Sequence, residues 1–68
     1  MPIKGHELAR EICRRGGEAQ YEQLVQPGWY NGDIRVSWRP GPNAEQKMIL
    51  CNDLDIFSEE QLTEMMRA

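Results

Sequence analysis

The dipeptide Asn31–Gly32 is the feature that most constrains how this chain can fold. A two-residue type I′ turn needs positive φ at both central positions, and Asn-Gly is the sequence that best meets this requirement. The turn would pair Tyr30 with Asp33. Because side chains alternate along a strand, four large apolar residues would then share one face of the hairpin, namely Trp29, Ile34, Val36 and Trp38. We therefore expect both tryptophans in the core, and Tyr30, Arg35 and Arg39 on the opposite face.

Two helices are predicted before this hairpin. Residues 3–17 carry an apolar stripe made by Leu8, Ala9, Ile12 and Cys13, and Gly16–Gly17 would end the helix. Residues 18–26 are rich in Glu, Gln and Ala, which favour a second helix that ends at Pro27–Gly28. The alternative is a strand. Its alternation would place Ala19, Tyr21 and Gln23 on one face, which is a poor set for a core, so we favour the helix.

A third strand and a last helix follow the hairpin. Residues 40–46 are rich in Pro, Gly and Asn and predict a loop. Residues 47–51 are almost continuously apolar, which predicts a strand covered on both faces, by a helix or by a second subunit. Ser58 and Gln61 form a capping box, and Phe57 and Leu62 a hydrophobic staple, at the start of a helix. Residues 1–68 are thus predicted to be one α+β domain, a three-stranded antiparallel meander packed by two or three short helices in the order α-α-β-β-β-α.

The size of the chain suggests self-association. A chain of 68 residues buries only about 60% of the surface that its unfolded form exposes, so its own core is marginal. Disulfides, metals or oligomerisation usually supplement such cores. The two cysteines are far apart in the sequence and only one histidine is present, which leaves a homodimer as the expected supplement. Without a signal peptide or an apolar span of about 20 residues, we expect a cytoplasmic protein that does not enter a membrane.

Charge is distributed unevenly along the chain. Residues 1–39 carry six basic and five acidic groups, giving +1, and residues 40–68 carry two basic and six acidic groups, giving −4. The sum of these values is the net charge of −3. Nucleic-acid binding would favour the opposite balance, because neutralisation of phosphates supplies most of that affinity. The acidic C-terminal part suits a partner with a basic surface, or serves only to keep a small domain in solution.

No residue pattern predicts catalysis, a cofactor or a metal site. His6 and Cys13 would lie about two helical turns, or roughly 10 Å, apart on the first helix, which is too far to share a proton. Cys13 is therefore interpreted as a small buried apolar residue. The stretch 52–60 contains several oxygen ligands but lacks the glycine that a calcium-binding EF-hand loop needs at its sixth position. We expect no enzyme activity.

The sequence favours a non-enzymatic interaction protein that occupies the surface of a partner protein, as inhibitors and adaptors do. Inhibitors that phages make against host defence or regulatory proteins belong to the same size class. Two surfaces are candidates for the partner: the acidic set Asp53, Asp55, Glu59, Glu60 and Glu64, and the outward sheet residues Tyr30, Arg35 and Arg39. The alternative is a regulator that binds single-stranded DNA or RNA. Its contacts would be Arg14, Arg15, Tyr30 and Arg35.

Overall fold

A three-stranded antiparallel sheet, in the order β2-β3-β4, organises the computed structural model, which describes residues 2–67. The strands of this sheet are β2 (Glu18–Gln23), β3 (Asp33–Arg39) and β4 (Lys47–Asn52). A second sheet pairs the short strands β1 (Ile3–Lys4) and β5 (Ile56–Phe57). The 3₁₀ helix η1 (Gly5–Glu7) leads into α1 (Leu8–Arg14), and α2 (Glu59–Met65) follows β5. The α+β class and the antiparallel meander are as predicted.

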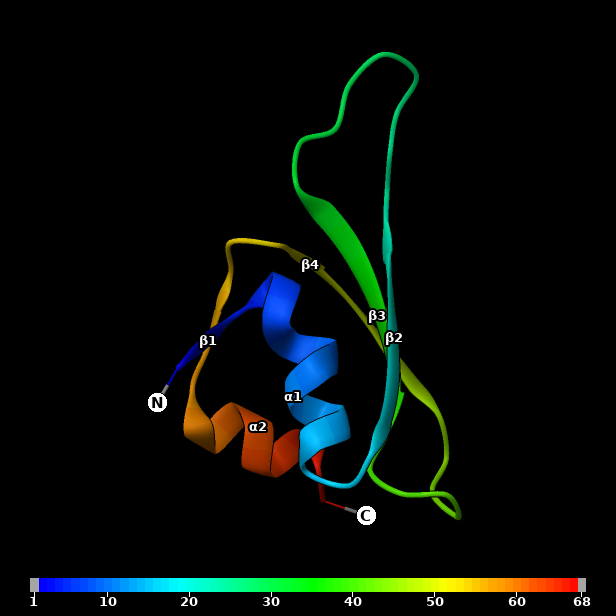
Figure 1. Cartoon of the computed structure of the whole chain (residues 1–68), viewed down its shortest axis with the longest axis vertical. Coiled ribbons are helices and arrows are strands. Elements are labelled where there is room, and N and C mark those ends of the chain that lie inside the picture. The colour runs from blue at the N-terminus through cyan, green and yellow to red at the C-terminus, as the bar shows by residue number, and fades with distance from the viewer. Residues whose placement is uncertain (1, 68) are drawn as a thin grey trace.

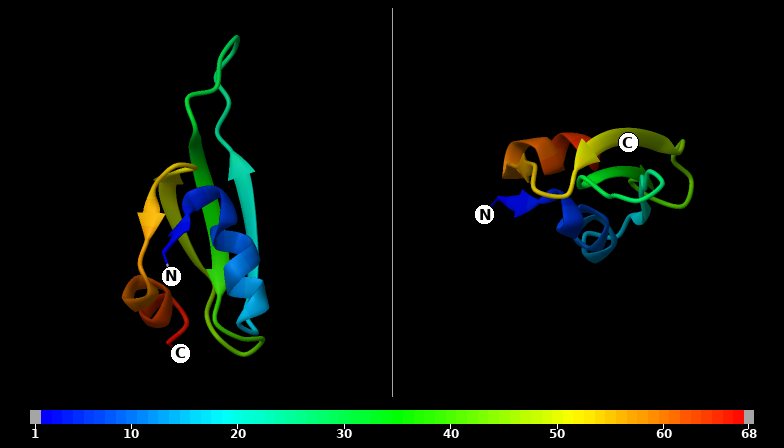
Figure 2. Two further views of the ribbon diagram at one scale, coloured as in Figure 1. Left: turned by 60° about the vertical axis from the view of Figure 1, so that its left-hand side comes forward. Right: turned by 90° about the horizontal axis from the view of Figure 1, so that it is seen from above.

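Both helices lie against the same face of the large sheet (Figures 1 and 2). The core between these two layers consists of buried side chains from the sheet, from β5 and from both helices: Leu8, Ile12, Ile34, Val36, Trp38, Phe57 and Leu62. The indole N–H of Trp38 donates a hydrogen bond to the carbonyl oxygen of Met65 over 3.2 Å, which joins β3 to the end of α2. The other face of the sheet, which we call the outer face, carries no helix.

The predicted start of the last helix and the predicted end of the first helix are confirmed. The hydroxyl of Ser58 accepts from the amide of Gln61 over 3.2 Å, and the side chain of Gln61 accepts from the amide of Ser58 over 2.7 Å. Phe57 and Leu62, the predicted staple, are both buried. The first helix ends before Gly16, which has a φ of +96°. Two details of that helix are wrong. Ile3–Lys4 form strand β1, and α1 begins only at Leu8. Leu8 and Ile12 are buried as expected, but Cys13 lies at the exposed margin of the stripe.

The predicted second helix is wrong, because residues 18–23 form strand β2. Pairing with β3 outweighs the helical composition of this segment, since strand formation depends on neighbouring strands more than on intrinsic preference. The register sets Glu22 opposite Arg35 and Glu18 opposite Arg39, and both pairs form ion pairs. On the core side, Ala19 packs against the core whereas Tyr21 is 47% exposed. The order of the main elements is therefore α-β-β-β-α.

The predicted Asn31–Gly32 hairpin is also wrong. Ile34 pairs with Gln23 of β2, and Trp29 lies outside the sheet with 56% of its surface exposed. Asn31 does not have a positive φ, so the type I′ turn does not form. The part of the prediction that concerns β3 itself is confirmed. Ile34, Val36 and Trp38 face the core, and Arg35 and Arg39 lie on the outer face.

Strand β4 forms where the sequence predicts it, but only one of its faces is covered. Ile49 and Cys51 are partly buried against the core. Met48 and Leu50 point to the outer face and are 57% and 64% exposed. Helices of the same chain therefore do not cover both faces of β4, and cover by a second subunit stays a prediction. In the single chain, Met48 and Leu50 form an exposed apolar pair at the edge of the sheet.

Candidate functional site: a protruding apolar finger

Residues 24–32, which connect β2 to β3, project beyond the helices as a narrow loop, here called the finger (Figures 1 and 2). Two of its apolar side chains are largely exposed, Val25 at 61% and Trp29 at 56%. More than half of the surface of Trp29 is therefore open to solvent, and aromatic residues of this kind are enriched at binding hot spots. The finger is therefore the leading candidate for a functional site.

The tip of the finger is a tight turn. The backbone amides and carbonyls of Gln26 and Trp29 exchange two hydrogen bonds, each 3.1 Å long. Pro27 and Gly28 lie between them, and Gly28 has a φ of +85°. Proline followed by a glycine with positive φ is typical of a type II turn, because proline presets its own φ and glycine takes the left-handed position without strain. The turn thus fixes Trp29 beside the tip.

The base of the finger is held by the turn that follows β4. The amide of Asp53 donates to the carbonyl oxygen of Gly32 over 2.7 Å. The side-chain amide of Asn52 donates to the carbonyl oxygen of Asn31 over 3.1 Å, and the hydroxyl of Tyr30 donates to the carboxylate of Asp53 over 3.1 Å. Desolvation, and then the hydrogen bond to Asp53, raise the pKa of Tyr30. The finger therefore has a fixed attachment to the body of the protein.

The electrostatic setting of the finger is acidic. Residues 24–32 contain no charged side chain, and the carboxylates of Asp33 and Asp53 lie at its base. A complementary surface would combine an apolar pocket for Trp29 with basic groups at its rim. Phosphate groups, in contrast, would meet no cation on the finger.

The predicted acidic residues do not form a single free surface. Glu59 accepts two hydrogen bonds from Arg15, at 2.7 and 2.6 Å, and this pairing lowers its pKa. Asp55 accepts from the amide of Asn52 over 2.9 Å, and Glu64 lies 3.4 Å from Arg67. Among residues 2–67, Glu60 makes no ion pair. Asp53 belongs to the base of the finger, and the glutamates belong to α2.

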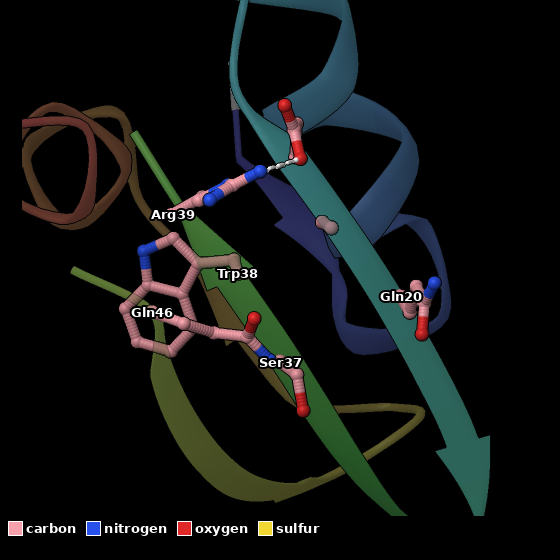
Figure 3. A pocket seen from close by; sticks show the side chains of 7 residues that line it. Gln20, Ser37, Trp38, Arg39 and Gln46 are labelled. Carbon is pink, nitrogen blue, oxygen red and sulfur yellow. Dashed lines mark hydrogen bonds and ion pairs between the residues drawn. The ribbon is translucent and has the colours of Figure 1, made fainter. Parts of the chain in front are cut away.

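The predicted arginines of the sheet lie on the outer face and are paired. Arg39 donates to Glu18 at 3.0 and 2.7 Å, and Arg35 binds Glu22. Figure 3 shows the shallow hollow beside Arg39, with Gln20, Ser37 and Gln46 at its walls. Its volume of about 100 Å³ is smaller than the roughly 300 Å³ at which small-molecule sites begin. Tyr30, the third residue of that predicted set, lies on the finger instead.

The residues of the nucleic-acid alternative are not brought together. Arg14 and Arg15 both bind Glu11 near the end of α1. These contacts lower the pKa of Glu11 from 4.5 to about 2, the hydrogen bond from Arg14 having the largest effect. Arg35 is paired with Glu22 on the outer face, and Tyr30 lies on the finger, hydrogen-bonded to Asp53. The finger projects at the opposite end of the molecule from the C-terminal end of α1, where Arg14 and Arg15 lie (Figure 1). No continuous basic surface results from these four residues.

Within residues 2–67, no three His, Cys, Asp or Glu side chains gather as metal ligands would. No helix in that range is long and apolar enough to cross a membrane. Burial, with a smaller effect from Asp55, raises the pKa of the Cys51 thiol, so that it is less readily ionised.

Sequence reasoning missed the finger because the Asn-Gly signal outweighed a second turn signal nearby. The sequence predicts a helix end at Pro27–Gly28, whereas these residues form the turn at the tip.

The fold and its surfaces define a small two-layer α+β protein with a protruding apolar loop. Comparison with known proteins found no matching family model, no similar curated protein and no similar solved structure.

Proposed function

We propose that this protein is a non-enzymatic interaction module that occupies the surface of a partner protein, in the manner of an inhibitor or an adaptor, and that the finger is its main contact. The observation that carries this proposal is the exposure of Trp29 at the end of a projecting loop. Transfer of a tryptophan from water into a partner's pocket is one of the largest single contributions available to a protein interface.

The shape of the finger supports an insertion mode of binding. The Gln26–Trp29 turn and the hydrogen bonds of Tyr30 and Asn52 order the loop before it meets a partner. Binding then costs less conformational entropy than it would for a loop that becomes ordered on contact. Val25 and Trp29 together supply an apolar anchor.

The charges around the finger favour a partner with a basic rim. Asp33 and Asp53 lie at the base of an uncharged finger, so the matching surface is an apolar cleft with lysine or arginine at its rim. The acidic C-terminal part of the chain adds long-range attraction to such a surface. A partner protein with a basic face, which the sequence favours, fits this description.

The experiment is capture of proteins from an extract of the source cells, compared between variants by quantitative mass spectrometry. Trp29→Ala removes the anchor, and Tyr21→Ala is the matched control, because Tyr21 is an exposed aromatic residue outside the finger. We expect at least one protein to bind the wild type and the control equally and to be lost with Trp29→Ala. Equal capture by all three proteins would refute the finger as the contact.

A further inference from the structure

Strand β4 has a free edge at Met48 and Leu50, whose outward backbone groups have no hydrogen-bond partner within residues 2–67. The amide of Asp53 donates to the carbonyl oxygen of Gly32, the residue directly before β3. In an antiparallel pair, the backbone groups of every second residue point toward the same neighbouring strand. Cys51 and Ile49 therefore also point their amides and carbonyls toward β3. Met48 and Leu50 point theirs away, toward the side of β4 where the three-stranded sheet ends.

The two edges of the sheet differ in how they are protected. Natural proteins guard edge strands with charged side chains or with neighbouring groups. Strand β2 carries Glu18 and Glu22, and its Ala19 carbonyl lies 3.8 Å from the Cys13 thiol. Strand β4 instead presents the exposed apolar side chains of Met48 and Leu50 beside its free backbone groups. Lys47, at the start of β4, is its one charged side chain, so at Met48 and Leu50 exposed apolar side chains adjoin free backbone groups that no charge within the strand guards. On β2, the exposed Tyr21 lies between the charged Glu18 and Glu22.

We propose that β4 pairs with the β4 edge of a second copy of this chain, in an antiparallel register centred on Ile49. In this register the amide and carbonyl of Met48 bond to the carbonyl and amide of Leu50 of the other copy, and the reverse pair forms by symmetry. All of the free backbone groups of Met48 and Leu50 are used. The two three-stranded sheets would join into one continuous sheet, and this pairing is independent of the finger.

Neighbouring registers are less favourable because they would need backbone groups that are already bonded or that lie outside the strand. A register centred on Leu50 would set Met48 against Asn52 of the other copy. The amide of Asn52 already bonds to the carboxylate of Asp55 over 2.9 Å, and its carbonyl accepts from the amide of Asp55 over 3.0 Å. A shift in the opposite direction would need Gln46, which precedes the strand.

Side chains on both faces support the same register. On the outer face, Met48 of each copy would lie beside Leu50 of the other, covering side chains that are 57% and 64% exposed in a single chain. On the core face, Ile49 would meet its own counterpart, next to a groove of about 350 Å³ whose apolar walls include Trp38, Phe57 and Met65. This contact would supply the additional burial that a core of this size needs.

Charge complementarity points to a second copy. Lys47 makes no ion pair within residues 2–67. The register sets Lys47 opposite Cys51 of the other copy, one residue from the Asn52 amide that holds Asp55. The ammonium of Lys47 would therefore reach the Asp55 carboxylate of the second copy, and symmetry would form two such pairs. These pairs would offset part of the repulsion between two chains of net charge −3.

The test measures the mass of the purified chain by sedimentation over a wide range of concentrations. We expect the two-chain mass to appear as the concentration rises. Met48→Pro removes an amide that β3 does not use, so the fold should persist while the dissociation constant rises about tenfold or more. Gln23→Pro is the matched control at the free edge of β2, and it should leave the dimer intact. Leu50→Lys tests the same edge should Met48→Pro fail to fold by circular dichroism.

Cross-linking tests the register. In a background carrying Cys13→Ser and Cys51→Ser, Ile49→Cys should give an intermolecular disulfide, because non-hydrogen-bonded antiparallel pairs bring Cα atoms to about 4.5 Å. Leu50→Cys should cross-link less. A one-chain mass at every concentration, or loss of the dimer with Gln23→Pro instead of Met48→Pro, would overturn the proposal. Preferential cross-linking through Leu50→Cys would overturn the register.

Discussion

The amide of Asp53 donates a hydrogen bond of 2.7 Å to the carbonyl oxygen of Gly32, and this contact joins the turn after β4 to the base of the finger. Gly32 has a φ of +94°. A Cβ atom at this position would lie 2.8 Å from the side-chain nitrogen of Asn52 and 2.9 Å from a carboxylate oxygen of Asp53. Both side chains are already engaged in hydrogen bonds, so they cannot move away freely. Position 32 therefore requires glycine for two reasons: its φ is positive, and there is no room for a Cβ atom.

Gly32→Ala is therefore expected to lower the free energy of unfolding by about 2 kcal/mol or more, from backbone strain and from steric conflict together. Gly28→Ala adds backbone strain alone, because the φ of Gly28 is +85° but no atom lies within 4 Å of an added Cβ. This variant should lower the free energy of unfolding by about 1 kcal/mol. Gly41→Ala has neither problem and serves as the control. Urea unfolding of the three variants measures the series, and equal stability of Gly32→Ala and Gly41→Ala would contradict this account.

The two tryptophans should respond differently to truncation. Trp38 is 8% exposed and is hydrogen-bonded to Met65, so Trp38→Ala should cost about 3–5 kcal/mol of stability. Trp29 is 56% exposed, and Trp29→Ala should change stability by about 0.5 kcal/mol or less. Urea unfolding followed by circular dichroism measures both changes. A large loss of stability in Trp29→Ala would show that Trp29 is part of the core.

Fluorescence of single-tryptophan variants gives a separate check. Trp38→Phe leaves Trp29 as the only indole, and this emission should be red-shifted and readily quenched by acrylamide because the ring is in water. Trp29→Phe leaves the buried indole, whose emission should be blue-shifted and protected. Equal quenching in the two variants would contradict the exposed position of Trp29.

Stability should fall in acid through Glu11. Its hydrogen bonds from Arg14 and Arg15 lower its pKa from 4.5 to about 2. A carboxylate whose folded pKa is depressed stabilises the protein above its unfolded pKa, and this contribution is lost as the pH falls from about 4.5 to about 2. Glu11→Gln should be less stable than the wild type at neutral pH, and the difference should shrink across that interval. Thermal unfolding at several pH values measures it, and a constant difference would contradict the assignment.

Mixed single-stranded oligonucleotides should not bind, even at low salt. The finger carries no cation, Arg14 and Arg15 are both paired with Glu11, and Arg35 is paired with Glu22 on the sheet. Electrostatic affinity for nucleic acid is greatest at low ionic strength, so that condition is the strictest test. Titration of oligonucleotides followed by tryptophan emission is the measurement. Quenching that weakens as salt is added would revive the nucleic-acid alternative.

Local sequence signals predicted the features that depend on neighbouring residues. The capping box of Ser58 and Gln61 and the glycine after α1 involve residues a few positions apart, so their hydrogen bonds and φ values follow from the sequence alone. The alternation of Ile34, Val36 and Trp38 likewise follows from the geometry of a single strand. The class of the fold was predicted from such signals.

Pairing between distant segments decided what the local signals left open. Residues 18–23 have a helical composition, yet Glu18 and Glu22 meet Arg39 and Arg35 only when β2 lies beside β3. Once that register forms, Gln23 takes the place opposite Ile34 that the Asn31–Gly32 turn would have given to Trp29. Of the predicted partner-binding residues, only Tyr30 and Asp53 belong to the finger or its base.

The sequence by itself determined the end of α1, the start of α2, the core face of β3, the α+β class and the acidic balance of charge. Only the tertiary structure decided that Trp29 is exposed, that the chain turns at Pro27–Gly28, and that Met48 and Leu50 lie on an open edge. The physical reason is the range of the interactions. Caps and alternation are set within one segment, whereas strand register and burial depend on which distant segment supplies the partner.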